Sequence, residues 1–207
     1  MQYDQCKTCR RLGQKLFLKG DRCFSQKCAM LKRAYAPGPQ KKRRGGSASA
    51  YKKSLEQKQT LKKWYGLSER QFKAYVEKSL AKMGKVEDVS AELIRRLEKR
   101  MDNVVFHLGF TKSKYSAHQA VNHGMFLLNG KKHNIGSTIL KTGDIISIRD
   151  NKHKAFKNLD ERLKDVSTPS WLELNKKEYK GTVKTEPNIA ELNLPYDFHS
   201  IIEAYSK

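Results

Sequence analysis

The sequence predicts an α+β fold, in which a mostly helical N-terminal domain with a four-cysteine knuckle carries a small inserted module of helices packed on a short twisted antiparallel sheet. Three observations predict this class. Apolar residues recur at helical spacing between residues 51 and 108. Short apolar runs bounded by turn signals follow from residue 125. All four cysteines lie within the first 28 residues, which sets that region apart from the rest of the chain.

The composition indicates a polyanionic partner. The 207 residues include 43 Lys and Arg against 21 Asp and Glu, a formal net charge of +22, and 38% hydrophobic residues suffice for a core. Residues 1–65 hold 18 Lys and Arg against three acidic residues, whereas residues 151–207 are close to neutral. A membrane is disfavoured because no apolar run approaches the roughly 18 residues that span a bilayer and no signal-peptide core is present. We therefore expect nucleic acid, bound most strongly by the N-terminal third.

The cysteines are spaced as Cys6-x2-Cys9, then thirteen residues, then Cys23-x4-Cys28. A C-x2-C knuckle and a second pair on a short loop suit tetrahedral zinc, with zinc–sulfur bonds of about 2.3 Å. Two disulfides or four reduced thiols are the alternatives, and disulfides fit poorly in a chain without an export signal. The spacing favours one structural zinc ion, which with four protein ligands has no open position for catalysis.

A basic stretch follows the knuckle. Residues 37–49 combine prolines and glycines with Lys41, Lys42, Arg43 and Arg44. Such a stretch is either a solvated linker or a segment that orders against RNA phosphate, and the overall charge favours the second.

Three helices are expected next. A basic helix over Tyr51–Tyr65 has only a partial apolar face, and its terminal aromatic residues are expected to anchor it in the core. Ser68-x-x-Gln71 indicates a capping box at the start of the second. Ser90 can cap a longer helix that ends at Gly109, with an apolar stripe facing the core. The opposite edge of that helix is basic, and is either a solvated face or an RNA contact: Arg95, Arg96, Lys99 and Arg100.

The remaining pattern indicates a short helix from residue 113 or 114 to 122, a strand over 125–128, an Asn129-Gly130 hairpin turn and a return strand to residue 135. A second turn over 141–144 leads into a strand over 145–148. The elements divide the chain into four expected regions: a zinc knuckle with basic linker (1–45), a helical N-terminal domain (46–92), the α+β module (93–157) and a C-terminal segment that packs back on the helical domain (158–207).

The run RMDNVVFHLGF over residues 100–110, with AVNHGMFLLNGKKHNIGSTILKTGDIISIR over 120–149, resembles the bacterial-type small-subunit ribosomal protein S-four family and its RNA-binding module. The resemblance extends outside the module, so that it covers essentially the whole chain. The further matching pieces are the cysteine knuckle, Pro37-Gly38-Pro39, residues 53–65, Ser170-Trp171-Leu172 and residues 203–207. The chain departs from the family at residues 117–120, where a basic residue is common, and many members lack the cysteines.

The resemblance implies a structural constituent of the small ribosomal subunit that is not an enzyme. It implies a primary rRNA-binding protein that binds a multi-helix junction in the 5′ domain of small-subunit rRNA, nucleates assembly and sits near the mRNA entry channel. The implied partners are that rRNA, neighbouring small-subunit ribosomal proteins and mRNA near the entry channel, with no membrane and no small-molecule substrate. The implied location is a cytoplasmic ribosome, with an organellar ribosome as the alternative.

RNA helices present backbone shape more readily than base edges, so we expect basic side chains on phosphates, and amides or hydroxyls on phosphate and ribose. Asn103 and Gln119 are equally well explained as capping or surface amides, and His123 as complementing a helix C-terminus. The expected RNA-binding residues are Lys41, Lys42, Arg43, Arg44, Lys52, Lys53, Arg95, Arg96, Lys99, Arg100, Asn103, Lys112, Lys114, Tyr115, His118, Gln119, His123 and Lys131.

Two other classes are less well supported. An RNA-modifying enzyme needs an added catalytic domain, and outside the module the sequence shows no Gly-rich nucleotide loop, nucleophile elbow or clustered acid–base pair. A zinc-finger DNA-binding regulator needs a recognition helix after the knuckle. The segment after Cys28 instead reaches Pro37 and Pro39 within a few residues.

Overall fold

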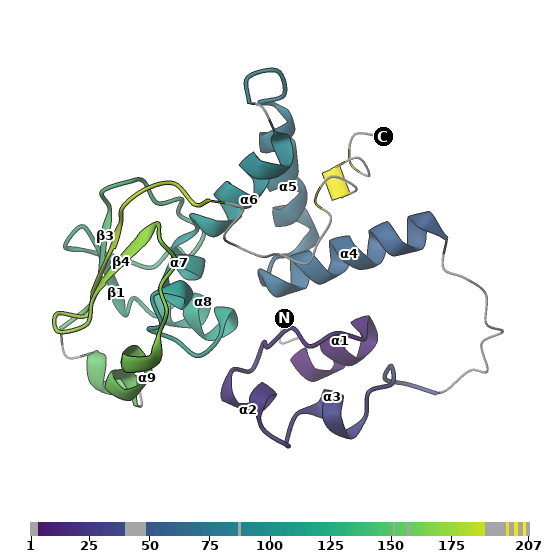
Figure 1. Cartoon of the computed structure of the whole chain (residues 1–207), viewed down its shortest axis with the longest axis horizontal. Coiled ribbons are helices and arrows are strands. Elements are labelled where there is room, and N and C mark those ends of the chain that lie inside the picture. Colours follow the sequence, from purple (N-terminus) through teal and green to yellow (C-terminus); the bar gives the residue numbers. More distant parts are fainter. Residues whose placement is uncertain are drawn as a thin grey trace. The chain divides into compact units, whose positions relative to one another are not determined.

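The computed structural model describes residues 4–39, 49–86, 88–150, 152–156, 158–188, 198, 201, 202 and 205. The chain divides into two compact units, the first formed by residues 1–81 with 195–207 and the second by residues 82–194 (Figure 1). Helices and a five-stranded antiparallel sheet confirm the predicted α+β class. Among the described residues, no helix combines the length and the apolarity that a membrane crossing requires.

The first unit is helical. Local caps explain its boundaries: Asp4 starts the first helix by accepting from two backbone amides, and Ser68 and Gln71 form both bonds of the predicted capping box, at 3.2 and 3.0 Å. Its helices are α1 (Gln5–Leu12), α2 (Asp21–Phe24), α3 (Ala29–Lys32), α4 (Ala50–Trp64) and α5 (Glu69–Leu80).

The core of the first unit lies where α4 and α5 meet the loop after α1. Its buried apolar side chains come from these segments and from the end of the chain, and include Leu16, Leu18, Leu61, Tyr65, Leu67, Phe72, Val76, Phe198, Ile201 and Ile202. The buried Tyr65 agrees with the expected helix-end anchor. The end of the chain also packs here, because the Tyr205 hydroxyl donates to Glu69 at 2.9 Å and its ring lies against Phe72.

The second unit packs helices on a sheet with strand order β2-β1-β3-β5-β4, in which all neighbours are antiparallel. The β1–β2 hairpin turns at Asn129 and Gly130, both with positive φ, as its predicted turn requires. The elements are α6 (Val89–Glu98), α7 (Met101–His107), α8 (Lys114–Asn122), β1 (Phe126–Leu128), β2 (Lys131–His133), β3 (Ile145–Ile148), η1 (His153–Ala155), α9 (Leu159–Asp165), β4 (Leu172–Asn175) and β5 (Lys180–Val183).

The single long helix expected from Ser90 to Gly109 is wrong, because the structure has two helices there. The first is capped by Asp88, whose side chain accepts from the Ser90 amide at 2.7 Å. The interruption falls at Arg100, whose backbone is extended at φ −65° and ψ 137°.

Backbone bonds to the segment 136–140 cause this interruption. The Met101 amide donates to the Thr138 carbonyl at 2.9 Å, and the Leu140 amide donates to the Lys99 carbonyl at 2.8 Å. These partners take backbone groups that a continuous helix would pair internally. A contact with residues almost forty positions later therefore sets the boundary between α6 and α7.

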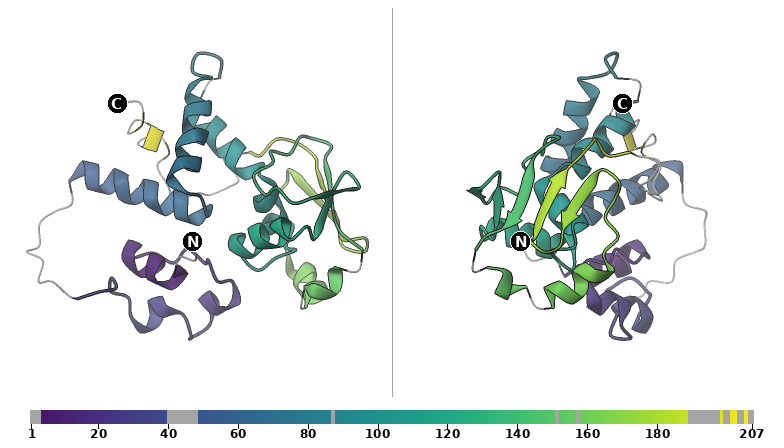
Figure 2. Two further views of the ribbon diagram at one scale, coloured as in Figure 1. Left: turned by 180° about the vertical axis from the view of Figure 1, so that it is seen from behind. Right: turned by 60° about the vertical axis from the view of Figure 1, so that its left-hand side comes forward.

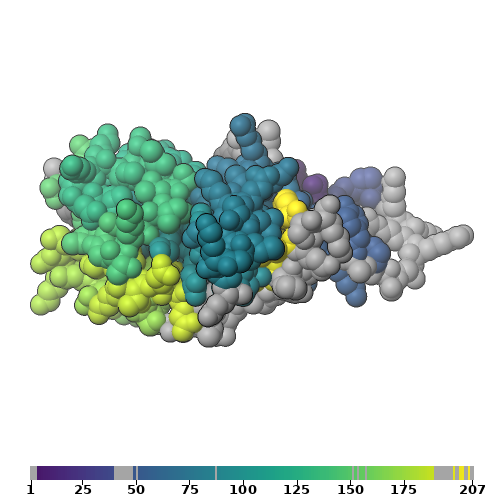
Figure 3. Space-filling model, turned by 90° about the horizontal axis from the view of Figure 1, so that it is seen from above, coloured from purple at the N-terminus to yellow at the C-terminus, as the bar shows by residue number. Residues whose placement is uncertain are grey.

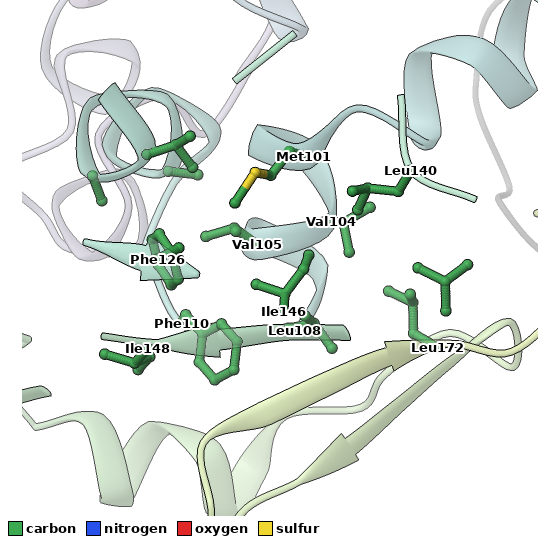
Figure 4. Close-up of a cluster of buried hydrophobic side chains, with 14 of the residues drawn as sticks. Met101, Val104, Val105, Leu108, Phe110, Phe126, Leu140, Ile146, Ile148 and Leu172 are labelled. Carbon is green, nitrogen blue, oxygen red and sulfur yellow. The ribbon is translucent and has the colours of Figure 1, made fainter. Parts of the chain in front are cut away.

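The core of the second unit lies between α7, α8 and the sheet, and α7 and α8 lie on one sheet face (Figures 1 and 2). Figure 4 shows side chains of α7, and Leu108 directly after it, gathered with those of the strands, including Ile146. Gly181 on β5 has no room for a side chain, because a Cβ there would lie 2.3 Å from Leu108. The close approach of α7 to the sheet thus depends on that glycine.

The segment after residue 158 contributes more to the second unit than the expected regions assign to it. Strands β4 and β5 extend the sheet beyond β3, and Leu163 and Trp171 are buried in the same core. Figure 3 shows residues 160–188, in yellow-green, continuous with residues 110–150. By contrast, the expected boundary places the whole of 158–207 against the helical domain.

Candidate nucleic-acid interface

Helix α8 presents a polar face to solvent. Ser113 and Ser116 form a capping box at its start, and Gly124, with φ +64°, follows its C-cap His123. Ala117, Ala120 and Val121 face the core. Three of the predicted RNA-binding side chains lie on the exposed face of α8 or at its end: His118, Gln119 and His123.

The His118 ring is hydrogen-bonded to the buried carboxylate of Asp102. Its Nδ1 lies 2.9 Å from Oδ2 of Asp102, and half of the His118 side chain is exposed. The Arg100 guanidinium binds the same carboxylate at 3.0 and 2.6 Å. Burial by itself raises the pKa of Asp102, but the His118 hydrogen bond and the Arg100 charge outweigh it and leave that pKa lowered. The carboxylate is therefore ionised and orients the ring, leaving Nε2 as the nitrogen that can bond an outside group.

Arg100 and Asn103 lie in the interior, which the sequence did not indicate. Arg100 is 2% exposed and Asn103 is 3% exposed. Asn103 donates through Nδ2 to the Glu98 carboxylate at 2.5 Å and to the Glu98 carbonyl at 3.2 Å. His107 lies 2.7 Å from the same carboxylate through Nε2. A fully buried carboxylate needs such donors, and they draw these side chains inward.

Lys114 belongs to the same interior cluster. Its ammonium group is buried and lies 5.7 Å from the centre of the Phe106 ring. Burial, helped by the Arg100 charge, lowers its pKa to about 8 against the opposing effects of Glu98 and Asp102. Tyr115 beside it is partly exposed. Lys114 thus supports the α7–α8 pair from within.

Exposed lysines flank the α8 face. Lys112 precedes the helix, and Lys131 lies on the β1–β2 hairpin. Lys132, which was not predicted, also lies here, because a Cβ on Gly124 would be 2.7 Å from its Cε. The Asn129-Gly130 turn sets a hairpin register that pairs Lys132 with Leu127, and this register could have placed Lys132 near the end of α8.

The basic edge of α6 is partly neutralised within its own unit. Arg96 lies 2.8 Å from Glu92, and Lys99 lies 2.8 Å from Glu186. Arg95, Arg96 and Lys99 are all only partly exposed. Part of the positive charge of this edge is therefore taken up by carboxylates of the same unit.

In the first unit, Lys52 and Lys53 are exposed near the start of α4, with Lys52 3.9 Å from Glu56. The predicted residues of the basic stretch, Lys41, Lys42, Arg43 and Arg44, lie outside the described residues.

The four cysteines are free thiols that line one cavity of about 20 Å³. Burial raises the pKa of Cys9, and the charges of Cys23, Cys6 and Cys28 raise it further. Within the part of the chain that the structure describes, no group of three or more Cys, His, Asp or Glu side chains closes into a metal-binding cluster. The thiols therefore face one space without converging on a single point.

Two known protein families match this chain, one over each part. The family described as ribosomal protein S4/S9 N-terminal domain matches residues 1–98, and the family described as S4 domain matches residues 99–146. The two matches meet where α6 ends and α7 follows.

Three relatives named small ribosomal subunit protein uS4 align over 98% of this chain and 96% of their own length. The identity is 44% for that of Thermotoga petrophila, 43% for that of Thermotoga maritima and 43% for that of Syntrophus aciditrophicus. These comparisons and the fold show that the chain belongs to the uS4 family of small ribosomal subunit proteins.

Proposed function

We propose that this protein is a structural, non-enzymatic constituent of the small ribosomal subunit that binds small-subunit rRNA. The observation that carries the proposal is the exposed polar and basic face of α8, presented by a module that matches the S4 domain, within a chain that aligns with uS4 proteins over nearly its whole length. The net charge of +22 supports a polyanionic partner of this kind.

Direct contact with RNA falls to the exposed side chains of the module: Lys112, His118, Gln119, His123, Lys131 and Lys132. Lysines bind phosphates, whereas the imidazole and amide groups reach phosphate or ribose across the shallow groove of an RNA helix. Arg100, Asn103 and Lys114 act through position, because they hold α7 and α8 in the arrangement that presents this face.

The resemblance to the family supports a finer placement. The site on the rRNA is a multi-helix junction of the 5′ domain, and the protein binds early and nucleates assembly on a cytoplasmic ribosome. It lies near the mRNA entry channel beside other small-subunit proteins.

We also propose that Cys6, Cys9, Cys23 and Cys28 hold one structural zinc ion. The support is the donor chemistry and the shared cavity, because four thiols face one space, as the thiolate ligands of a single dication must. Cys6 and Cys9 of α1, Cys23 of α2 and Cys28 at the start of α3 would hold the ion, which would supply no reaction chemistry and would link these three helices.

The RNA proposal is tested by measuring affinity for a transcript of the small-subunit rRNA 5′ domain across a salt series, with an unrelated folded RNA as competitor. The double variant Lys112→Gln with Lys131→Gln is compared with the charge-matched control Lys176→Gln with Lys177→Gln, on the exposed β4–β5 turn. We expect selective binding by the wild type and a lower salt slope for the first pair, by about 0.7 to 0.9 per lost phosphate contact.

Equal affinity of the wild type for both RNAs would refute specific rRNA recognition. Equal losses in the two double variants would show that net charge, and not the α8 face, carries binding.

The zinc proposal is tested by elemental analysis of the purified protein and by counting reactive thiols before and after chelation. One zinc per chain and four thiols that become reactive only on chelation are expected. Metal-free protein with the same fold and the same rRNA affinity as freshly purified protein would contradict it.

A further inference from the structure

A groove in the first unit lies between α1 and α4 and is separate from the cysteine cavity. Its volume is about 380 Å³. Helix α1 runs beside α4 in both ribbon views (Figures 1 and 2). The polar residues that line the groove are Asp4, Lys7, Thr8, Arg11, Gln59 and Lys63.

The helical repeat explains why these residues face α4. Lys7 and Arg11 are one turn apart, so they share a face of α1. Cys6 and Cys9 lie toward the opposite face, where they line the cavity shared with Cys23 and Cys28. The helix that carries two of the thiols therefore also presents two cations to the groove that it shares with α4.

The groove has an excess of positive charge. Among the described residues that line it, Asp4 is the one carboxylate, and that group already caps α1 by accepting from the amides of Cys6 and Lys7, at 3.1 and 3.2 Å. Its distance to the Lys7 ammonium is 3.7 Å, and both side chains are largely exposed to water.

The surroundings of Lys63 also disfavour its charged form. Burial lowers the pKa of Lys63, and the positive charges of Lys62 and Arg11 lower it further, against the opposing effect of the Glu69 charge. An anion beside the three cations relieves both effects, because it supplies the opposite charge that burial and like charges disfavour.

We propose that this groove holds one backbone phosphate of RNA together with its ribose. Lys7, Arg11 and Lys63 supply the charge, and the Gln59 amide and Thr8 hydroxyl are placed to reach the sugar or a phosphate oxygen. The volume matches the range of pockets that enclose small ligands, which suits a single nucleotide unit better than a flat helix face does. The inference rests on the proposed rRNA binding and adds a second contact, in the first unit, to the α8 face.

The test uses the full-length protein, the 5′-domain transcript and a salt series. The groove triple variant, Lys7→Gln with Arg11→Gln and Lys63→Gln, is compared with a charge-matched triple on the exposed face of α5, Arg70→Gln with Lys73→Gln and Lys78→Gln. A third variant, Gln59→Trp, fills the groove and keeps every charge. Circular dichroism, thermal unfolding and zinc content establish that each variant retains the wild-type fold.

We expect the groove triple and Gln59→Trp each to lower the salt slope by about 0.7 to 0.9, the value for one phosphate, while the α5 triple changes it less. Phosphate-ethylation interference on the transcript should lose the same single backbone position in both groove variants. A wild-type slope for Gln59→Trp, or an equal loss in the α5 triple, would overturn the inference. If the wild type shows no preference for the transcript, the proposed function fails; if it does and the groove variants match it, only the groove inference fails.

Discussion

The two units handle charge in opposite ways. The first unit, residues 1–81 with 195–207, has a formal net charge of +15, whereas residues 82–194 carry +7. In the second unit, cationic and polar groups turn inward onto two buried carboxylates, Glu98 and Asp102. In the first unit, Lys7, Arg11 and Lys63 share a groove with one exposed carboxylate, Asp4.

The first unit also exposes its large apolar side chains more than the second unit does. Phe24 and Tyr51 of the first unit are each 76% exposed, whereas the most exposed large hydrophobic side chain described in the second unit is Met83, at 62%. The described part of the second unit therefore satisfies more of its own packing and electrostatics than that of the first does. We expect zinc and RNA to stabilise the first unit much more than the second.

The largest expected effect is metal removal. Binding of structural zinc contributes roughly 10–16 kcal/mol in small knuckles, far more than the local core of α1 to α3 can replace. Chelation, or the variant Cys9→Ser, should raise amide hydrogen exchange throughout residues 4–39 while exchange in α7 and the sheet stays slow. Added zinc should reverse the effect of chelation. Unchanged protection of residues 4–39 would remove the contrast between the units.

The next effect concerns the buried carboxylate of the second unit. Glu98→Ala leaves Asn103, His107 and Lys114 without their shared anion, so we expect a loss of about 3–5 kcal/mol in the free energy of unfolding. Urea unfolding of the full chain measures it. The control Glu173→Ala removes an exposed partner of Lys184 and should cost less than about 1 kcal/mol. A similarly small loss for Glu98→Ala would mean that the interior network does not hold α7 and α8 together.

A smaller effect depends on pH. Burial lowers the pKa of Lys114 from 10.5 to about 8, so between these values the unfolded chain binds more protons than the folded one. The stability of the second unit should therefore rise as the pH increases from 8 to 10.5, by on the order of 2–3 kcal/mol. Lys114→Met should lack this rise, and the difference between the two pH profiles isolates the group. Parallel profiles would show that the Lys114 ammonium is not held in a desolvated site.

The smallest effect is at the end of the chain. Tyr205→Phe removes the 2.9 Å hydrogen bond to Glu69 and keeps the ring against Phe72. Because the bond is exposed, we expect a loss of only about 0.5–1 kcal/mol in the stability of the first unit, measured by denaturant unfolding. A loss several times larger would show that the stability of the first unit depends strongly on its own internal contacts, which would contradict the contrast drawn between the two units.

Local chemistry made much of this protein predictable from its sequence. The caps of α5 and α8, the Asn129-Gly130 turn and the strand that follows the 141–144 turn depend on residues a few positions apart. The exposure of His118, Gln119 and His123 follows from the period of α8. The same short-range patterns carried the resemblance to the family that the comparisons show.

Tertiary structure alone decided the rest, because the deciding contacts join residues far apart in the chain. The 136–140 segment separates α6 from α7, and β5 pairs with β3 across more than thirty residues. Arg100 and Asn103 are residue types that commonly bind RNA, yet their side chains are buried and bind the carboxylates of Asp102 and Glu98. The α1–α4 groove joins residues more than fifty positions apart. Sequence patterns show which side chains share a face of one element, but only packing decides what that face meets.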